Sequence, residues 1–185
     1  MDWFASTVKN VYLPLKVARS QKFLRMPRSP LPKVGQAENG KITLALANAV
    51  NAQCGKLKYQ ADPANGLYDM YNHPEHTQYL LNTGNYGKSS NDCDDYTGYA
   101  QALFREAGVD PGEHWEWNVL VKPFKQFSQG QYNHVICGFR MGDWYGVIDT
   151  NTAARGKIFW FKGSLSDAKK HFIETFKETY PADYY

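Results

Sequence analysis

A stretch whose apolar residues have helical spacing is followed, within a few residues, by consecutive strand-like runs. Between Tyr96 and Ala107 the apolar positions are 96, 99, 100, 103, 104 and 107, the spacing of a helix that buries one face. Because helices precede a block of consecutive strands, we predict an α+β domain with an antiparallel sheet. The strand-like runs, rich in β-branched and aromatic residues, lie at 115–122, 133–140, 144–150 and 157–161.

Further helices are predicted before and after this block. Residues 41–55 read as a helix ending at Gly55, because glycine is favoured just past a helix C-terminus. A short helix follows Pro74, and the chain closes with a helix over 164–180 whose N-cap is Ser164 or Ser166. A glycine- and serine-rich loop separates the short helix from Cys93.

The front of the chain differs from the rest in charge. Residues 1–36 hold seven Lys and Arg residues against one Asp, whereas the remainder carries 14 basic and 17 acidic residues. We therefore divide the chain into a basic arm with a proline-rich linker, 1–40, and a domain, 41–185. Such an arm can lie on the domain surface or dock onto a partner protein. Nucleic-acid contact is disfavoured, since seven dispersed charges are a weak electrostatic signal.

The remaining sequence excludes several classes of protein. No window reaches the roughly 20 apolar residues of a membrane helix. The N-terminus lacks the basic-then-apolar pattern of a signal peptide, so we expect a cytoplasmic rather than an exported protein. Three widely spaced cysteines without a Cys-x-x-Cys pair argue against a disulfide scaffold and a thiolate zinc site.

Cys93 stands at the start of the strongest predicted helix. Helix N-termini lower the pKa of a thiol through free N–H groups and the positive end of the dipole, and a thiolate is the reactive form. Most free cysteines are buried and inert, but Asn91, Asp92, Asp94 and Asp95 make a poor setting for a core residue. We therefore predict that Cys93 is a nucleophile.

A nucleophilic cysteine needs a base, and His134 is the strongest of five candidates. It opens a run in which Ile136 shares its face, whereas Val135 and Cys137 point the other way. Cys137 is therefore predicted to be a core residue. His114, in a turn, is the main competitor. The others, predicted to lie on the surface, are His73, His76 and His171.

The following run supplies a group to orient the imidazole. If Met141 and Gly142 form a two-residue turn, His134 pairs with Asp149 on the same face. If Gly142 and Asp143 form it, His134 faces Asn151 and Asp149 lies diagonal to it. We predict Asp149 as the orienter, with Asn151 as the alternative.

Three blocks together resemble a known family. "DCDDYTGYAQALFREAGV", "NHVICGF" and "WYGVIDTN", with the upstream stretch from Ile42, are similar to the transglutaminase-like cysteine peptidases of bacteria and their phages, within the papain-like superfamily. The resemblance spans residues 42–151. It implies a papain-like α+β core and a Cys93–His134–Asp149 triad. Asn91 stands where the family usually has glycine, and Asp94 where its calcium-dependent members commonly have glutamate.

The resemblance also implies two ancillary groups. Carboxylates beside Cys93 raise the pKa of its thiol by charge repulsion, unless they point away or bind a cation. Clusters of oxygen ligands are suited to Ca²⁺. In the calcium-dependent relatives the matching positions, Asp92 and Asp94 here, bind the ion. Acidic residues in a first helical turn also favour the dipole without any metal, so no cofactor is required. The first oxyanion donor is expected to be the Cys93 backbone N–H, and an upstream aromatic residue, Tyr59, to be the second.

These residues lead to one functional expectation and several alternatives. We expect a thiol hydrolase, a peptidase or amidase, that acts on a protein or peptide through an acyl-enzyme. The same triad serves acyl transfer to amines, as in transglutaminases, and deamidation of glutamine. The contrasting hypothesis is a structural or binding module, such as a phage-particle component docked by its basic arm, which makes a virion-associated location the alternative to a cytoplasmic one.

Overall fold

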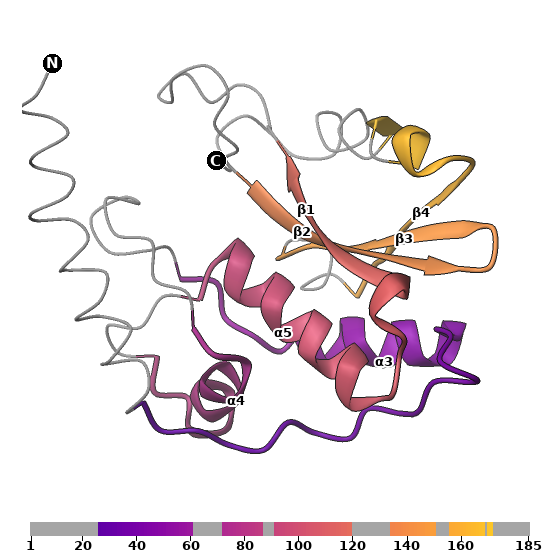
Figure 1. The fold of residues 1–185 in the computed structure, drawn as a ribbon. Coiled ribbons are helices and arrows are strands. Elements are labelled where there is room, and N and C mark those ends of the chain that lie inside the picture. The colour runs from indigo at the N-terminus through magenta and orange to yellow at the C-terminus, as the bar shows by residue number, and fades with distance from the viewer. Residues whose placement is uncertain are drawn as a thin grey trace, which may run out of the picture.

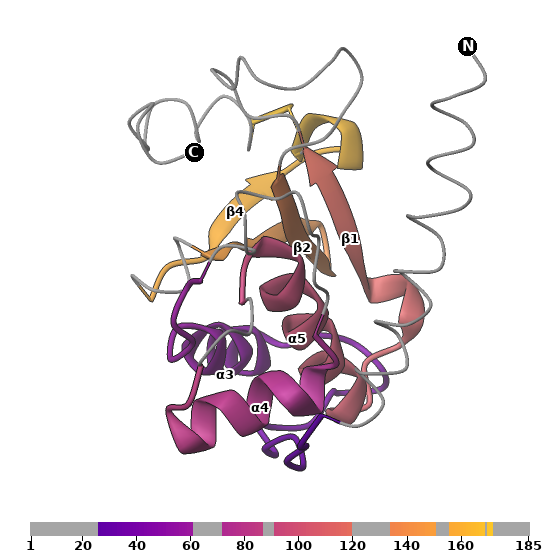
Figure 2. The same cartoon turned by 90° about the vertical axis from the view of Figure 1, so that its left-hand side faces the viewer.

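The structure, a computed structural model, describes residues 26–60, 72–86, 91–119, 134–150, 156–168 and 170–171. Three helices lie together below an antiparallel sheet (Figures 1 and 2), so the predicted α+β class is confirmed. None of the helices in these ranges is long and apolar enough to cross a membrane. The elements are α3 (Leu44–Cys54), α4 (Pro74–Thr83), α5 (Cys93–Glu106), η2 (Pro111–Glu113), β1 (His114–Val119), β2 (His134–Met141), β3 (Trp144–Ile148) and β4 (Phe159–Lys162).

Helix α3 is bounded by the expected capping residues. The Thr43 hydroxyl accepts a hydrogen bond from the Leu46 N–H at 3.2 Å, which satisfies one of the unpaired N–H groups of the first turn. Gly55 caps the other end, as predicted. The helix begins three residues later than the apolar pattern suggested, because the Thr43 side chain caps its first turn.

Helix α5 lies at the centre of the core. It begins at Cys93 with Asp92 as its N-cap, and Gly108, at φ 80°, follows its C-cap. Its buried face matches the predicted spacing. Packed in the main core cluster from this helix are Tyr96, Tyr99, Ala100, Leu103 and Phe104.

The strands form a sheet in the order β1-β2-β3-β4, each antiparallel to its neighbour. Met141 pairs with Trp144 and Cys137 with Ile148, so Gly142 and Asp143 form the hairpin turn. Gly142 adopts φ 60°, a conformation that glycine reaches at little steric cost. Of the two predicted registers, the structure therefore has the one in which Asp149 lies diagonal to His134.

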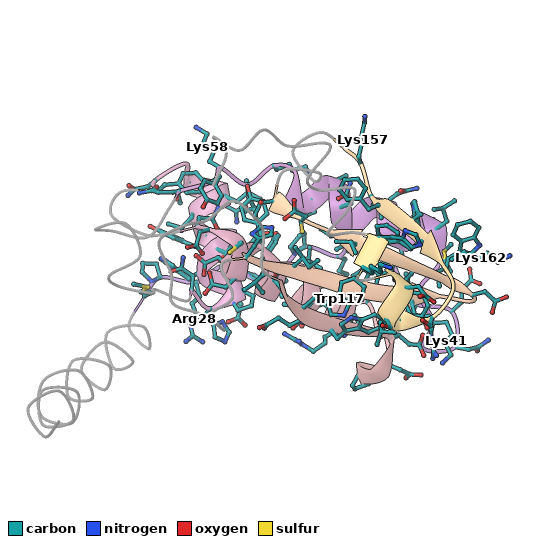
Figure 3. All side chains as sticks on the ribbon, turned by 90° about the horizontal axis from the view of Figure 1, so that it is seen from above. Arg28, Lys41, Lys58, Trp117, Lys157 and Lys162 are labelled. Carbon is teal, nitrogen blue, oxygen red and sulfur yellow. The ribbon has the colours of Figure 1, made fainter. Side chains whose placement is uncertain are left out.

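The two faces of the sheet bury different clusters. Cys137, Phe139 and Ile148 face the helices and join the main core. Ile136 and Val147 point to the opposite face, where Trp117 and Phe161 pack with them; Figure 3 looks onto this face, with Trp117 labelled. The alternation predicted for β2 is thus confirmed, and Cys137 is a core residue.

Part of the predicted linker packs against the domain. Leu31, Val34 and Ala37 contact the main core cluster. The Ser29 N–H donates to the Glu75 carbonyl at 2.9 Å, and a ring nitrogen of His76 lies 2.7 Å from the Pro27 carbonyl oxygen. His76 is consequently 4% exposed, so its predicted surface position is wrong. Residues 1–25 of the arm lie outside the described ranges.

Ser164 is the N-cap of the helical turn at 165–168. Its hydroxyl accepts a hydrogen bond from the Asp167 N–H at 3.1 Å, and the Asp167 carboxylate accepts one from the Ser164 N–H at 3.2 Å. This reciprocal pair is a capping box, which decides between the two predicted caps. Residues 169 and 172–180 of the predicted final helix are outside the described part of the chain.

Glu113 joins three distant segments. It is 4% exposed and accepts hydrogen bonds from Lys41 at 2.7 Å and from Arg140 at 2.7 and 3.1 Å. Hydrogen bonding from Arg140 is the largest of the effects that lower its pKa to about 2. The ionised carboxylate therefore ties the segment before α3 and the start of β1 to the end of β2.

We expect this cluster to make stability pH-dependent. Because the folded pKa lies below the unfolded value, the stabilisation is complete above about pH 4.5 and is lost as the pH falls towards 2. Glu113→Gln should lower the free energy of unfolding at pH 7 by roughly 1–3 kcal/mol and flatten its fall between pH 5 and pH 2. Urea unfolding at each pH measures both effects. Equal acid sensitivity in the two proteins would contradict this assignment.

Candidate active site

His134 and Asp149 meet at one end of the sheet. His134 is the first residue of β2, and Asp149 directly follows the last residue of β3. Nε2 of His134 lies 2.5 Å from Oδ1 of Asp149, and the two residues are 3% and 2% exposed. The observed register makes them diagonal rather than opposed neighbours. Asn151, the alternative orienter, lies outside the described residues.

This contact selects one form of the imidazole. An ionised carboxylate only accepts hydrogen bonds, so the Nε2–H of His134 donates to Asp149. The neutral ring then carries its lone pair on Nδ1, which is the atom that can take up a proton. Thr150 also donates its hydroxyl to the same carboxylate oxygen, at 3.4 Å. Asp149 thus fixes both the tautomer and the orientation of the ring.

Cys93 lies at the same end of the sheet. The backbone N–H of Val135, the residue after His134, hydrogen-bonds to its sulfur, and the charge of Asp149 acts on the thiol. Val119, the last residue of β1, pairs with His134, and in Figure 1 the tip of β1 and the start of α5 lie on the same side of the molecule. The start of α5 therefore lies near this end of the sheet, with the Cys93 sulfur at the backbone of Val135 and close enough to Asp149 for its charge to act on the thiol.

Burial and neighbouring carboxylates keep Cys93 protonated. Burial raises the pKa of the Cys93 thiol far above its ordinary value, and the charge of Asp92 raises it further, while the Val135 N–H lowers it. Asp94 and Asp149 add smaller increases. The predicted lowering by the helix end is thus outweighed. A resting thiol must lose its proton during attack, which makes a general base necessary.

The other two cysteines lie in the core. Cys54 on α3 and Cys137 on β2 are both 0% exposed, and burial raises the pKa of each. None of the three forms a disulfide, and Cys93 alone of them is partly exposed. Only Cys93 is therefore open to an external electrophile.

A cluster of carboxylates surrounds the first turn of α5. Oxygen atoms of Asp92, Asp94 and Asp95 all lie within 4.8 Å of one another. Asp95 is 1% exposed and accepts hydrogen bonds from the Asn72 backbone N–H at 2.5 Å and from its side-chain amide at 2.9 Å. The donor set is hard oxygen at a spacing that one Ca²⁺ ion could bridge. Asp95 and Asn72 were not predicted as a pair, and their separation of 23 residues carries no local signal.

The segment 57–60 lies beside the start of α5. Gln60 and Asn91 exchange two backbone hydrogen bonds, of 3.0 and 2.8 Å, and the Asn91 side chain donates to the Lys58 carbonyl at 2.7 Å. The Tyr96 hydroxyl donates to the Leu57 carbonyl at 2.6 Å. Asn91 is fully buried and anchors this segment. Tyr59, the predicted oxyanion donor, is 61% exposed.

The other histidines lie away from this end of the sheet or on the surface. His114 pairs with Phe139, five positions along β1 from the residue that pairs with His134, a separation of about 17 Å. Its ring stacks on Phe104, neither of its nitrogens has a partner among the described residues, and burial lowers its pKa. His73 is half-exposed and pairs with Glu75. His114 is therefore a packing residue.

Comparisons with protein-family models, with curated proteins and with solved structures find no match for this chain. The chemistry of the site must therefore be argued from its own residues. These supply a partly exposed thiol, an oriented imidazole and a buried carboxylate at one end of a sheet. That set can carry nucleophilic attack on a carbonyl group.

Proposed function

We propose that the protein is a thiol hydrolase, a peptidase or amidase with a papain-like core, in which Cys93, His134 and Asp149 form the catalytic triad. The observation that carries the proposal is the buried contact between His134 Nε2 and Asp149 Oδ1, beside the strand residue that binds the Cys93 sulfur. A buried carboxylate that fixes the tautomer and orientation of an imidazole is what a general base requires. A protein or peptide substrate fits the partly exposed thiol.

The reaction follows from the roles of the three side chains. His134 Nδ1 takes the Cys93 proton as the sulfur bonds to the carbonyl carbon, and the carbonyl oxygen becomes an oxyanion. When the carbon–nitrogen bond breaks, the imidazolium returns this proton to the leaving amine and an acyl-enzyme remains. Water, deprotonated by His134, then attacks the thioester, which releases the acid and restores the thiol. Asp149 stabilises the imidazolium in both halves.

The acceptor in the second half distinguishes the related activities. A primary amine in place of water gives a transglutaminase, and a glutamine side chain as the acyl donor with water as acceptor gives a deamidase. The second candidate function is a structural or binding module docked by the basic arm, which hydrolysis does not require. A cytoplasmic or virion-associated location fits both proposals.

Iodoacetamide labelling separates an enzyme from a module. In the hydrolase, Cys93 should be alkylated selectively at neutral pH, with Cys54 and Cys137 protected as internal controls by their burial. His134→Ala should suppress this labelling, because the base is gone. Peptide mapping by mass spectrometry identifies the modified residue. Slow and equal labelling of all three thiols, unaffected by His134→Ala, would favour the module.

Calcium binding at the carboxylate cluster gives a second test. If Asp92 and Asp94 hold Ca²⁺ together with Asp95, saturating calcium should raise the melting temperature by about 5–10 °C at 100 times the dissociation constant, and EDTA should reverse the rise. Asp94→Asn should reduce the shift, whereas Asp143→Asn, in the exposed hairpin turn, should not. An unchanged melting temperature and unchanged thiol labelling in EDTA would exclude this cation.

A further inference from the structure

His114 is a buried imidazole between the sheet and α5. It is 6% exposed, and its ring stacks on Phe104 with the two centroids 5.7 Å apart. Neither of its ring nitrogens has a hydrogen-bond partner among the described residues. A charged group that is buried without a partner is strongly disfavoured, so this position accepts the imidazole only in its neutral form.

The groups that face His114 from α5 and β2 do not favour a charged ring. Arg105, the residue after Phe104 on α5, acts on the imidazole with like charge. Cys137, on the face of β2 towards the helices, is a fully buried thiol whose pKa is raised by burial, so it supplies no negative charge. Burial, and then Arg105, lower the pKa of His114 below its ordinary value of 6.5.

The carboxylates on either side of His114 in the chain do not compensate either. Glu113 of η2 is bound by Lys41 and Arg140, as described above. Glu116, two residues further along β1, is exposed and does not hydrogen-bond to the ring. A proton on His114 would therefore add an uncompensated charge to the contact between β1 and α5.

This contact joins the two elements that lead to the candidate active site. Helix α5 begins at Cys93, and the last residue of β1 pairs with His134. Figure 1 shows the other end of α5 leading through η2 into β1, where His114 is the first residue. Loss of the contact at His114 would thus loosen the helix that carries Cys93 from the sheet that carries His134.

We infer that His114 is an acid-sensitive latch, which holds α5 against β1 while its imidazole is neutral and releases the contact when the imidazole is protonated. The inference does not depend on the hydrolase activity. Because the folded pKa lies below the unfolded one, the stabilisation by the latch is complete above about pH 6.5 and is lost as the pH falls below that value.

Urea unfolding of the full chain between pH 7.5 and pH 5 tests the latch. His114→Phe keeps an aromatic ring against Phe104 and removes the titrating group. Between pH 6 and pH 5 the folding equilibrium constant of the wild-type protein should fall about three- to tenfold more than that of His114→Phe, since the unfolded wild-type chain then binds up to one more proton than the folded one. An equal fall in the two proteins would overturn the inference.

A second variant serves if His114→Phe does not fold. Arg105 is exposed, so Arg105→Gln leaves the buried contact in place and removes the like charge. It should reduce the fall between pH 6 and pH 5, whereas Lys157→Gln, which removes a charge at another exposed position, should not. The same fall in both variants and in the wild-type protein would contradict the role of His114.

Hydrogen exchange locates the opening. Protection factors, which correct for the intrinsic pH dependence of exchange, should fall in residues 101–117 of the wild-type protein between pH 7.5 and pH 5, and more than in residues 159–162 of β4. A uniform fall across both regions would mean that acid acts on the whole domain and that His114 is not a latch.

Discussion

Replacing His134 with alanine is expected to lower the rate constant for acylation of Cys93 by roughly two to four orders of magnitude. The effect should be large because the thiol is protonated at rest: burial and Asp92 raise its pKa, so attack requires simultaneous removal of the proton. Stopped-flow detection of p-nitrophenolate released from p-nitrophenyl acetate measures the acylation step directly.

Two further variants locate the effect in the triad. Asp149→Asn should also reduce acylation strongly. The carboxylate only accepts hydrogen bonds and so keeps the proton on Nε2 of His134, whereas an amide can also donate and does not select this tautomer. His171→Ala removes an exposed histidine that stacks on Phe161 and should leave the rate unchanged. A similar loss of rate in the His134 and His171 variants would contradict the assignment of His134 as the base.

Phe104→Ala is expected to lower the free energy of unfolding by about 3–5 kcal/mol, the largest stability change that we predict. Phe104 is 0% exposed and lies between two rings, 5.7 Å from His114 and 5.4 Å from Phe139 by their centroids. Truncation would remove these contacts and leave a cavity between α5 and the sheet. Urea unfolding measures the loss as a lower midpoint at an unchanged slope.

An exposed apolar residue provides the matched control for this change. Leu165 is 45% exposed in the helical turn after β4, and Leu165→Ala should change stability by no more than about 0.5 kcal/mol. Because α5 carries Cys93, the Phe104 variant should also lose selectivity in thiol labelling at temperatures where it is still folded. A loss below about 1 kcal/mol for Phe104→Ala would mean that α5 is not packed against the sheet as described.

The elements that could be predicted from the sequence are those that depend on local spacing. The period of α5 identified its buried residues, and alternation in β2 predicted that Cys137 is a core residue, which it is. Both patterns repeat over enough residues to be distinguished from chance. The start of α5 at Cys93 followed from the polar residues before it.

The rest depends on contacts between distant segments. The hairpin register could not be decided, because Gly142 can be the second residue of one two-residue turn or the first of the next. Burial of His76 depends on a carbonyl 49 residues away, and Glu113 meets Lys41 across 72 residues. The raised pKa of Cys93 likewise results mainly from burial, which the local sequence does not determine.

Peptide mapping after a brief reaction with p-nitrophenyl acetate, stopped by acid, tests most directly whether the Cys93 sulfur attacks carbonyl carbon with His134 as its base. The predicted result is one acetyl group per chain, carried as a thioester on Cys93, in the wild-type protein and none in His134→Ala. An acetyl group on no cysteine, or an equal amount on Cys93 in the two proteins, would contradict the proposed chemistry.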